Sequence, residues 1–402
     1  MKLVVEQRHV GPRGFLACVL IIATLHILAI DMYAPALPKL QEDFGASASL
    51  LNLTMFIFMF VAAFAVLIAG PLSDKFGRKP VLLTACLLFT LSSLGCMIST
   101  SVIMLSAFRF GQAIGFGFVT TLESALVKDA YTDRDLKLCM SLVQSLILIG
   151  PVFAPFLGTF FLGLGSWRYI FAFLMAGGCL ATVLACLLSE TLPQQARLSD
   201  GVGAALAETG KRVRTLLGNG RFRGLTGIVS LAGLPFMSFI AVVSYVLLDD
   251  FGVSYTIYNA VYATVALTSV VAPFIYLKLS HTFGNRPILL ASFVVSGVSA
   301  VLMGTIGHLS PYSFLVAFVL FALIEGIIRP LSFVILLDQR PEQVGAASAW
   351  VNFVYSVFGS FGTIFATLPW PTYIFGLTCI MGVSTVLMVA LYALRVRVGA
   401  SS

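Results

Sequence analysis

The chain has 402 residues, of which 59% are hydrophobic and only 10% are charged, and its mean hydropathy is +1.01. Soluble domains are about 45–50% apolar and about 25% charged, so this composition excludes a water-soluble globule, a disordered chain, a collagen and a coiled coil. A formal net charge of +7 would suit a nucleic-acid-binding protein, but the position of the basic residues gives a different explanation.

Apolar stretches long enough to cross a bilayer follow one another along almost the whole chain. A transmembrane helix needs about 20 apolar residues. In chain order the stretches cover residues 15–36, 50–70, 80–99, 102–127, 137–164, 168–189, 223–248, 257–280, 287–306, 311–337, 343–368 and 370–394. The sequence therefore predicts an all-α polytopic membrane protein with 12 transmembrane helices.

The basic residues gather on one side of the predicted membrane. If the N-terminus is inside, 20 of the 24 Lys and Arg residues fall in inner segments, whereas the outer loops hold only Lys39 and Arg168. Arg109 and Arg329 lie within predicted helices. By the positive-inside rule both termini are predicted to be cytoplasmic. Basic loops thus explain the net charge without a nucleic-acid partner.

An internal repeat divides the chain near its middle. Residues 72–80, Leu-Ser-Asp-Lys-Phe-Gly-Arg-Lys-Pro, reappear at 279–287 as Leu-Ser-His-Thr-Phe-Gly-Asn-Arg-Pro. Each copy follows the second predicted helix of its half. The repeat predicts two pseudo-symmetric six-helix bundles, 1–189 and 223–402, joined by a basic cytoplasmic linker, 190–222, around a central cavity. Parallel halves of this kind are a transporter layout.

Enzymatic and cofactor signals are missing from the sequence. It has no G-x-x-x-x-G-K-[ST] phosphate-binding loop, its four histidines share no metal-ligand spacing, and its seven cysteines form no C-x-x-C pair. We therefore expect no enzyme activity, no metal and no cofactor. Uphill transport by such a chain would draw on an ion gradient.

Several motifs carry a family resemblance. Residues 70–79, Gly-Pro-Leu-Ser-Asp-Lys-Phe-Gly-Arg-Lys, resemble the G-x-L-[SA]-D-x-x-G-R-[KR] loop of the major facilitator superfamily. Residues 31–38, Asp-Met-Tyr-Ala-Pro-Ala-Leu-Pro, resemble the first-helix motif of its 12-span drug:proton antiporters, and most of all their bicyclomycin/chloramphenicol-resistance (Bcr/CflA) branch. Residues 109–113 resemble the fourth-helix R-x-x-Q-G motif, with Ala113 in place of glycine. The resemblance covers residues 14–193, whereas the C-terminal half matches only in layout and in its degraded loop.

The resemblance implies a cytoplasmic latch at the 70–80 loop. In this interpretation acidic and basic side chains bridge the inner ends of helices and hold one face of the carrier closed. The residues concerned are Gly70, Asp74, Gly77, Arg78, Lys79 and Asp129. The alternative is that the charges only set the topology.

A stripe of small residues marks the fifth predicted helix. Gly150, Ala154 and Gly158 recur at i, i+4 and i+8, which lets helix backbones approach closely in lipid, and Pro151 and Pro155 should bend the helix. Close packing alone is one of two explanations of this pattern. The resemblance adds an antiporter motif that seals the outer side.

Charges inside the predicted spans are the strongest functional signal, because a charged side chain in the bilayer is costly. Asp31 and Arg109 each lie about seven residues from the outer end of their helix, hence roughly 10 Å deep, so we expect them to meet. The favoured interpretation is a proton-coupling carboxylate with a positive neighbour. A purely structural ion pair is the alternative.

Three further charges and several amides complete the candidate cavity. Glu123 is interpreted either as a substrate-contacting acid or as a residue that reaches the interface. Glu325 and Arg329 have the i, i+4 spacing of a helical ion pair, for which a structural role is favoured over substrate contact. The candidate polar lining consists of Gln112, Asn52, Gln144 and Asn352.

Residues and resemblance together predict a proton-coupled exporter of small amphipathic, drug-like molecules that works by alternating access. Two alternatives stay open: a transporter, export or import, of one metabolite such as a nucleoside, sugar or amino-acid derivative, and a non-transporting membrane receptor or scaffold. We expect a monomer in a bacterial-type inner membrane. Its partners would be the substrate, protons and lipid.

Overall fold

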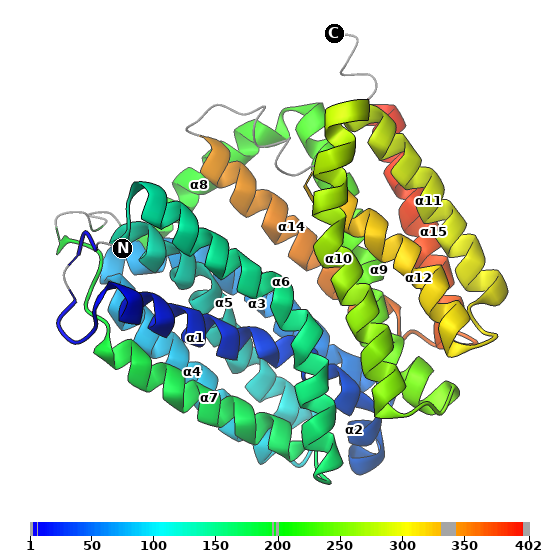
Figure 1. Ribbon diagram of the computed structural model, residues 1–402, viewed down its shortest axis with the longest axis horizontal. Coiled ribbons are helices and arrows are strands. Elements are labelled where there is room, and N and C mark those ends of the chain that lie inside the picture. The colour runs from blue at the N-terminus through cyan, green and yellow to red at the C-terminus, as the bar shows by residue number, and fades with distance from the viewer. Residues whose placement is uncertain (1–2, 6, 195–196, 198–200, 331–342, 397–402) are drawn as a thin grey trace. The chain divides into compact units, whose positions relative to one another are not determined.

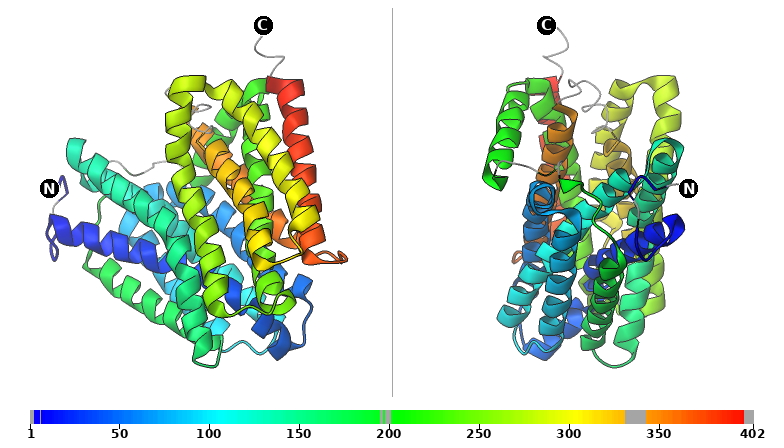
Figure 2. Two further views of the ribbon diagram at one scale, coloured as in Figure 1. Left: turned by 45° about the vertical axis from the view of Figure 1, so that its right-hand side comes forward. Right: turned by 90° about the vertical axis from the view of Figure 1, so that its left-hand side faces the viewer.

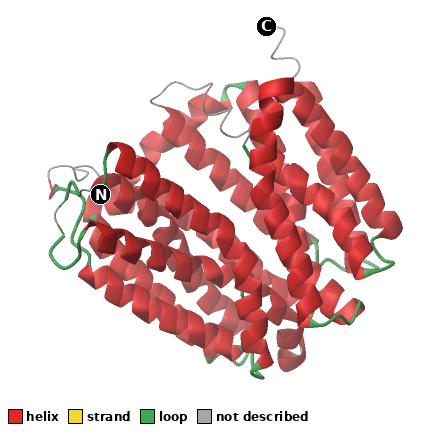
Figure 3. Ribbon diagram, in the orientation of Figure 1, coloured by secondary structure: helices red, strands yellow, loops and turns green. Residues whose placement is uncertain are grey.

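The computed structural model describes residues 3–5, 7–194, 197, 201–330 and 343–396, and all regular secondary structure in these ranges is helical (Figure 3). The elements are α1 (Pro12–Asp31), η1 (Ala34–Ala36), α2 (Leu37–Phe44), α3 (Ala48–Phe76), α4 (Arg78–Met97), α5 (Val102–Ala130), α6 (Asp133–Gly163), α7 (Arg168–Leu187), α8 (Val202–Leu217), α9 (Gly220–Ser244), η3 (Tyr245–Asp250), α10 (Tyr255–Phe283), α11 (Asn285–Ile306), α12 (Pro311–Ile328), α14 (Val344–Phe365), α15 (Tyr373–Leu391) and η5 (Tyr392–Val396). The all-α prediction is confirmed.

Within the described residues, 11 helical segments are long and apolar enough to cross a membrane, and the count reaches 12 if α6 is one bent span. The two parts of α6, Asp135–Leu146 and Gly150–Gly163, meet at 41°. Pro151 and Pro155 lie just beyond the bend, and each lacks the backbone N–H that a continuous helix requires. The predicted tenth span, 311–337, begins as α12, but its last part lies outside the described residues.

The first span differs from the prediction of one continuous helix over 15–36. α1 ends at Asp31, and the chain continues through the 3₁₀ turn η1 into the short helix α2. The cause is Pro35, which has no N–H to donate to the carbonyl of Asp31, whereas Pro38 lies in the first turn of α2, where a proline is tolerated. Asp31 therefore is the last residue of α1, inside a candidate span that continues from Pro12 to Phe44, and it is 6% exposed.

The chain divides into two compact units, Met1–Ala46 with Ile57–Glu208 and Ser47–Phe56 with Thr209–Ser402. In the first unit α1 lies between α6 and α7, and α4 packs along α5 and α7 (Figures 1 and 2). In the second unit α9 packs along α14 and α15, and α12 along α10 and α11. The predicted boundaries at residues 189 and 223 stay a prediction.

The predicted linker, 190–222, contains a helix that its polar composition conceals. α8 buries Val213 and Leu216, three residues apart on one face, and exposes Lys211, Arg212 and Arg214. Residues 195–196 and 198–200 of the linker lie outside the described part. An amphipathic helix with a basic outer face is typical of a segment that lies along a membrane surface.

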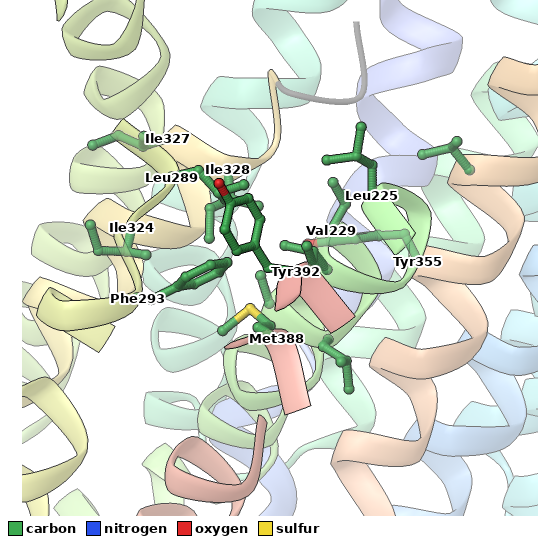
Figure 4. Packing of buried hydrophobic residues seen from close by; sticks show 14 of the residues in the cluster. Leu225, Val229, Leu289, Phe293, Ile324, Ile327, Ile328, Tyr355, Met388 and Tyr392 are labelled. Carbon is green, nitrogen blue, oxygen red and sulfur yellow. The ribbon is translucent and has the colours of Figure 1, made fainter. Parts of the chain in front are cut away.

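Each unit has its own apolar core. In the first unit, buried side chains of α1, α4, α5, α6 and α7 form one cluster that includes Phe15, Leu122 and Tyr131. In the second unit a corresponding cluster joins α8, α9, α10, α11, α12, α14, α15 and η5. Figure 4 shows part of it, with Tyr355 extending from α14 toward Leu225 and Val229 of α9.

Candidate functional site

Among the described residues of the first unit, Arg109 is the most completely enclosed charge, with 1% of its surface exposed. Its Nη1 donates to the backbone oxygen of Ala29 at 3.1 Å and to Oε1 of Gln112 at 2.8 Å. The guanidinium carbon lies 4.0 Å from the ring centre of Phe58 and 4.6 Å from that of Tyr33. Arg109 therefore connects α5 with α1 and α3, and two aromatic faces compensate part of its lost hydration.

Gln112 fixes the orientation of this guanidinium. Its Nε2 donates to Oγ of Ser93 on α4 at 2.8 Å, and that hydroxyl donates to the carbonyl of Phe89 at 2.7 Å. With its amide nitrogen engaged, the Gln112 oxygen must face Arg109. The sequence pointed to Arg109 and Gln112 by their spacing, but Ser93 has no motif that distinguishes it from other helical serines.

Asp31 ends the helix to which Arg109 is bonded. The carbonyl that accepts from Arg109 belongs to Ala29, two residues before Asp31. The structure thus brings the guanidinium to the last turn of α1. A direct contact between the Asp31 carboxylate and Arg109 stays a prediction.

Glu123 is the second buried acid of the first unit. It is 3% exposed, and its Oε1 has no hydrogen-bond partner among the described residues. Its helical neighbours Leu122 and Leu126 belong to the apolar core. It lies 14 residues, or about 21 Å, from Arg109 along α5, so the two do not pair directly.

At the predicted cytoplasmic end of the first unit, Arg78 joins the ends of three helices. Its guanidinium contacts Asp74 of α3 at 2.6 Å and Asp129 of α5 at 2.9 Å, while Arg78 is the first residue of α4. Nη1 also donates to Ser73 at 2.6 Å, and the Ser73 hydroxyl donates to the carbonyl of Gly70. We call Asp74, Arg78 and Asp129 the inner charge cluster.

Glu190 adds a member that the motif comparison did not identify as part of this cluster. Its Oε1 accepts from the backbone N–H groups of Arg78 at 2.8 Å and of Thr191 and Leu192 at 3.0 Å, and Oε2 accepts from that of Lys79 at 3.2 Å. The carboxylate therefore caps the N-terminus of α4, where negative charge is favourable. Lys79 completes the contact through Nζ, which donates to the carbonyl of Cys186 at 2.9 Å.

Gly77 makes this arrangement possible. Its φ of +99° is a backbone conformation that L side chains rarely adopt. A Cβ at this position would also overlap the carboxylate of Glu190. Both the turn between α3 and α4 and the approach of Glu190 therefore require glycine.

Replacing Asp74 by asparagine is expected to slow transport several-fold while substrate affinity changes little. The Asp74 side chain is 40% exposed, so losing this pair should cost about 1 kcal/mol or less of folding stability. Transport rate and substrate affinity, measured separately in proteoliposomes, test this. Lys39–Glu42, an exposed pair at 2.8 Å, supplies a matched control in Glu42→Gln. A large loss of affinity at normal turnover would contradict the role of Asp74.

The small-residue stripe of α6 faces α1 and η1. A Cβ on Gly150 would overlap the side chain of Ile27, and one on Gly158 would overlap the backbone of Met32 and the ring of Pro35. Ala154, between them, is fully buried. The stripe therefore permits close packing on the broken outer end of the first span, and its role as a seal stays a prediction.

The second unit holds Glu325, Arg329 and Tyr355. Glu325 of α12 is 2% exposed, and its Oε1 accepts from the Tyr355 hydroxyl of α14 at 2.7 Å. Nε of Arg329 lies 4.0 Å from the same oxygen, and the Arg329 side chain is 55% exposed. The expected i, i+4 pair is therefore at the limit of ion-pair distance, and the short bond of the carboxyl group goes to a tyrosine that the sequence did not single out.

The remaining predicted polar residues are placed separately. Asn52 on α3 is fully buried and its Nδ2 donates to the carbonyl of Ala48 at 3.2 Å. Asn352 on α14 is exposed and its Nδ2 donates to the carbonyl of Ser348 at 3.1 Å. Gln144 on α6 is exposed. The structure brings Gln112 alone of these amides to a charged candidate residue.

Comparison with known proteins gives the family. The family model described as the Major Facilitator Superfamily matches residues 19–245 and 225–401. An uncharacterized MFS-type transporter of Bacillus subtilis, YdgK, is 28% identical over 344 residues, which cover 84% of this chain and 85% of the relative.

Two further relatives have names that refer to drugs. The chloramphenicol resistance protein CraA of Acinetobacter baumannii is 28% identical over 69% of this chain and 64% of its own. The multidrug resistance protein MdtM of Salmonella typhimurium is 26% identical over 81% of this chain and 79% of its own. Among solved structures, a bacterial homologue of the human lysosomal transporter Spinster has a TM-score of 0.74 over 96% of both chains at 16% identity, a likeness of fold alone.

Proposed function

Because this chain belongs to the major facilitator superfamily, we propose that it is a proton-coupled exporter of small amphipathic, drug-like compounds that works by alternating access. The names of two relatives, a chloramphenicol resistance protein and a multidrug resistance protein, support drugs as the substrate class. The first-unit motifs around Asp31, Asp74 and Arg109 support the antiporter mechanism.

The observation that carries this proposal is the enclosed Arg109 beside the end of α1. Charges within a membrane-spanning segment are expensive and mark ion or substrate pathways. Arg109 is bonded to the backbone of the turn that ends in Asp31, so the carboxyl group and the cation belong to one helix junction. In the mechanism, Asp31 carries the proton and Arg109 adjusts how readily the proton is bound and released.

The energy requirement is met by a single proton. A proton gradient supplies about 1.4 kcal/mol per pH unit and about 2.3 kcal/mol per 100 mV for one charge. Their sum supports roughly 500-fold accumulation of a neutral compound at one-to-one exchange. No cofactor is required.

The proposal includes a cellular location, an orientation in the membrane and an oligomeric state. It is a multi-pass membrane protein with bacterial relatives. We place it in a bacterial-type inner membrane with both termini cytoplasmic, acting as a monomer on a small-molecule substrate and without catalytic activity of its own.

Transport by the purified protein in proteoliposomes tests the proposal. Chloramphenicol and a panel of amphipathic compounds are supplied with an imposed pH gradient and membrane potential. We expect accumulation that disappears when an ionophore collapses the gradient. Liposomes without protein give the passive background. Accumulation that survives the ionophore, or no transport of any compound, would contradict a proton-coupled exporter.

A further inference from the structure

The chain before α1 is attached to the end of α5 at the predicted cytoplasmic side of the first unit. The Val4 N–H donates to the carbonyl of Ala130, the last residue of α5, at 2.9 Å. Carbonyls in the last turn of a helix have no partner within that helix, so this bond satisfies one of them. Leu3 and Val10 pack against the apolar core of the first unit, which keeps the segment on the surface of the bundle.

The same segment is attached a second time, to the chain that leaves α7. The Ser189 N–H donates to Oε1 of Gln7 at 2.7 Å, and the Arg8 N–H donates to Oγ of Ser189 at 3.2 Å. Both the backbone donor and the hydroxyl group of Ser189 are therefore engaged. We call the described residues of this segment, 3–5 and 7–10, the strap.

Both attachment points lie next to charged residues that join the helix ends. Ala130 follows Asp129 of the inner charge cluster, and Ser189 precedes Glu190, which caps α4. Neighbouring Cα atoms are about 3.8 Å apart across a planar peptide bond. A Ser189 that is held in place therefore restricts where the Glu190 carboxylate can lie.

The Glu190 carboxylate in turn determines the order of the start of α4. Arg78 and Lys79 are the first two residues of that helix, so their N–H groups have no partner within it. The carboxylate accepts from these N–H groups at 2.8 and 3.2 Å. A continuous series of contacts thus leads from the strap through Ser189 and Glu190 to Arg78, the cation of the inner charge cluster.

We propose that Gln7 is a positioning residue for transport. It holds Ser189 and, through Ser189, the Glu190 carboxylate, so the strap sets how fast the inner charge cluster rearranges in each transport cycle. This inference rests on the proposed function, in which the inner ends of the helices move during alternating access. Hydrogen bonds and ion pairs are the only contacts that change.

Hydrogen exchange at the start of α4 tests the positioning without any transport measurement. The whole chain in detergent is analysed by mass spectrometry, and the peptide that contains Arg78 and Lys79 reports on their two amides, since Pro80 has none. Gln7→Ala removes the acceptor of the Ser189 N–H. We expect exchange of the two amides to become roughly two- to ten-fold faster, the equivalent of one lost hydrogen bond.

Two substitutions provide the control and a milder variant. Arg8→Ala is the matched control, because Arg8 contributes its backbone N–H to the bond with Ser189 and keeps it in the variant, so exchange should stay native. Ser189→Ala removes only the hydroxyl group and should increase exchange in the same direction as Gln7→Ala. It keeps the inference testable if Gln7→Ala does not fold.

Transport in proteoliposomes tests the consequence for the cycle. Gln7→Ala should lower turnover roughly two- to five-fold at unchanged substrate affinity. Combined with Asp74→Asn, the loss should be smaller than the product of the two separate losses, because both substitutions act on the same set of contacts. Combined with Glu42→Gln, which lies on α2 at the predicted outer side, the loss should equal that of Gln7→Ala alone.

The outcomes separate this inference from the exporter. Native exchange at Arg78 and Lys79 in both Gln7→Ala and Ser189→Ala would overturn the inference, whether or not the chain transports. Faster exchange with native turnover would overturn the effect on transport and leave the exporter standing. If the native chain transports no compound, the proposed function fails and the effect on transport with it, whereas faster exchange in Gln7→Ala would still support the positioning of Glu190.

Discussion

Replacing Asp31 by asparagine is expected to abolish gradient-driven export and to leave substrate binding and passive exchange. Asparagine has nearly the shape of a protonated aspartic acid but cannot release a proton, so one half of the transport cycle is lost. At a driving force that supports about 500-fold accumulation in the native protein, the variant should only equilibrate its substrate. Accumulation in proteoliposomes and binding in detergent measure the two quantities separately.

Asp43→Asn is the matched control for this substitution. Asp43 lies on α2, 12 residues further along the chain, and its Oδ2 accepts from Nε1 of Trp167 at 2.8 Å. An asparagine oxygen can accept the same bond, so export should persist. If the Asp31 variant still pumps against a gradient, the coupling carboxyl group lies elsewhere, and Glu123 would be the next residue to replace.

Replacing Arg109 by lysine is expected to reduce export by roughly 10- to 100-fold, equivalent to about 1.4–2.8 kcal/mol, although the charge is kept. The ammonium group of lysine is not planar and cannot reproduce the guanidinium contacts with Ala29 and Gln112 and with two aromatic faces. Hydrogen bonds to a buried charged group contribute about 1.5–3 kcal/mol each, so the lost geometry is sufficient for this effect. The pH profile of export should change together with the rate.

Arg168 supplies the control, because its guanidinium carbon also lies over an aromatic ring, that of Trp167, at 4.3 Å. Its Nη2 donates to the carbonyl of Ser99 at 3.0 Å. Arg168→Lys should keep nearly native export, since this residue is only partly buried and lies in a predicted outer loop. An Arg109→Lys variant with a native rate and pH profile would show that charge alone is needed at residue 109.

Hydropathy was sufficient to predict the spans, because the bilayer imposes a minimum length on every apolar helix. It was not sufficient at two places. The break after Asp31 depends on single prolines within an apolar stretch, which a hydropathy average does not register. The helix α8 has a polar composition, and its apolar residues become a face only when their helical spacing is followed.

The candidate site was predictable where its residues share one motif and not where partners are distant in the chain. Arg109 and Gln112 are three residues apart on one helix, and Asp74 and Arg78 are four apart. Glu190 reaches Arg78 across 112 residues, and Tyr355 reaches Glu325 across 30. Ser93 and Tyr355 are ordinary residues of apolar helices, and only the packing of neighbouring helices gives them their hydrogen-bond partners.

The cap that Glu190 forms on α4 has a mechanical consequence for the first unit. One carboxylate holds four backbone amides, two at the start of α4 and two in the chain that leaves α7. Because four backbone N–H groups share the Glu190 carboxylate, moving the carboxylate away from one of them lengthens the other three hydrogen bonds as well. We therefore expect the four hydrogen bonds to break together. The Arg78 side chain forms ion pairs with Asp74 at the end of α3 and with Asp129 at the end of α5, so both helix ends are bonded to the start of α4. We therefore expect this corner to move as one body, and bending within the unit to occur where prolines interrupt the helices, after Asp31 and in α6.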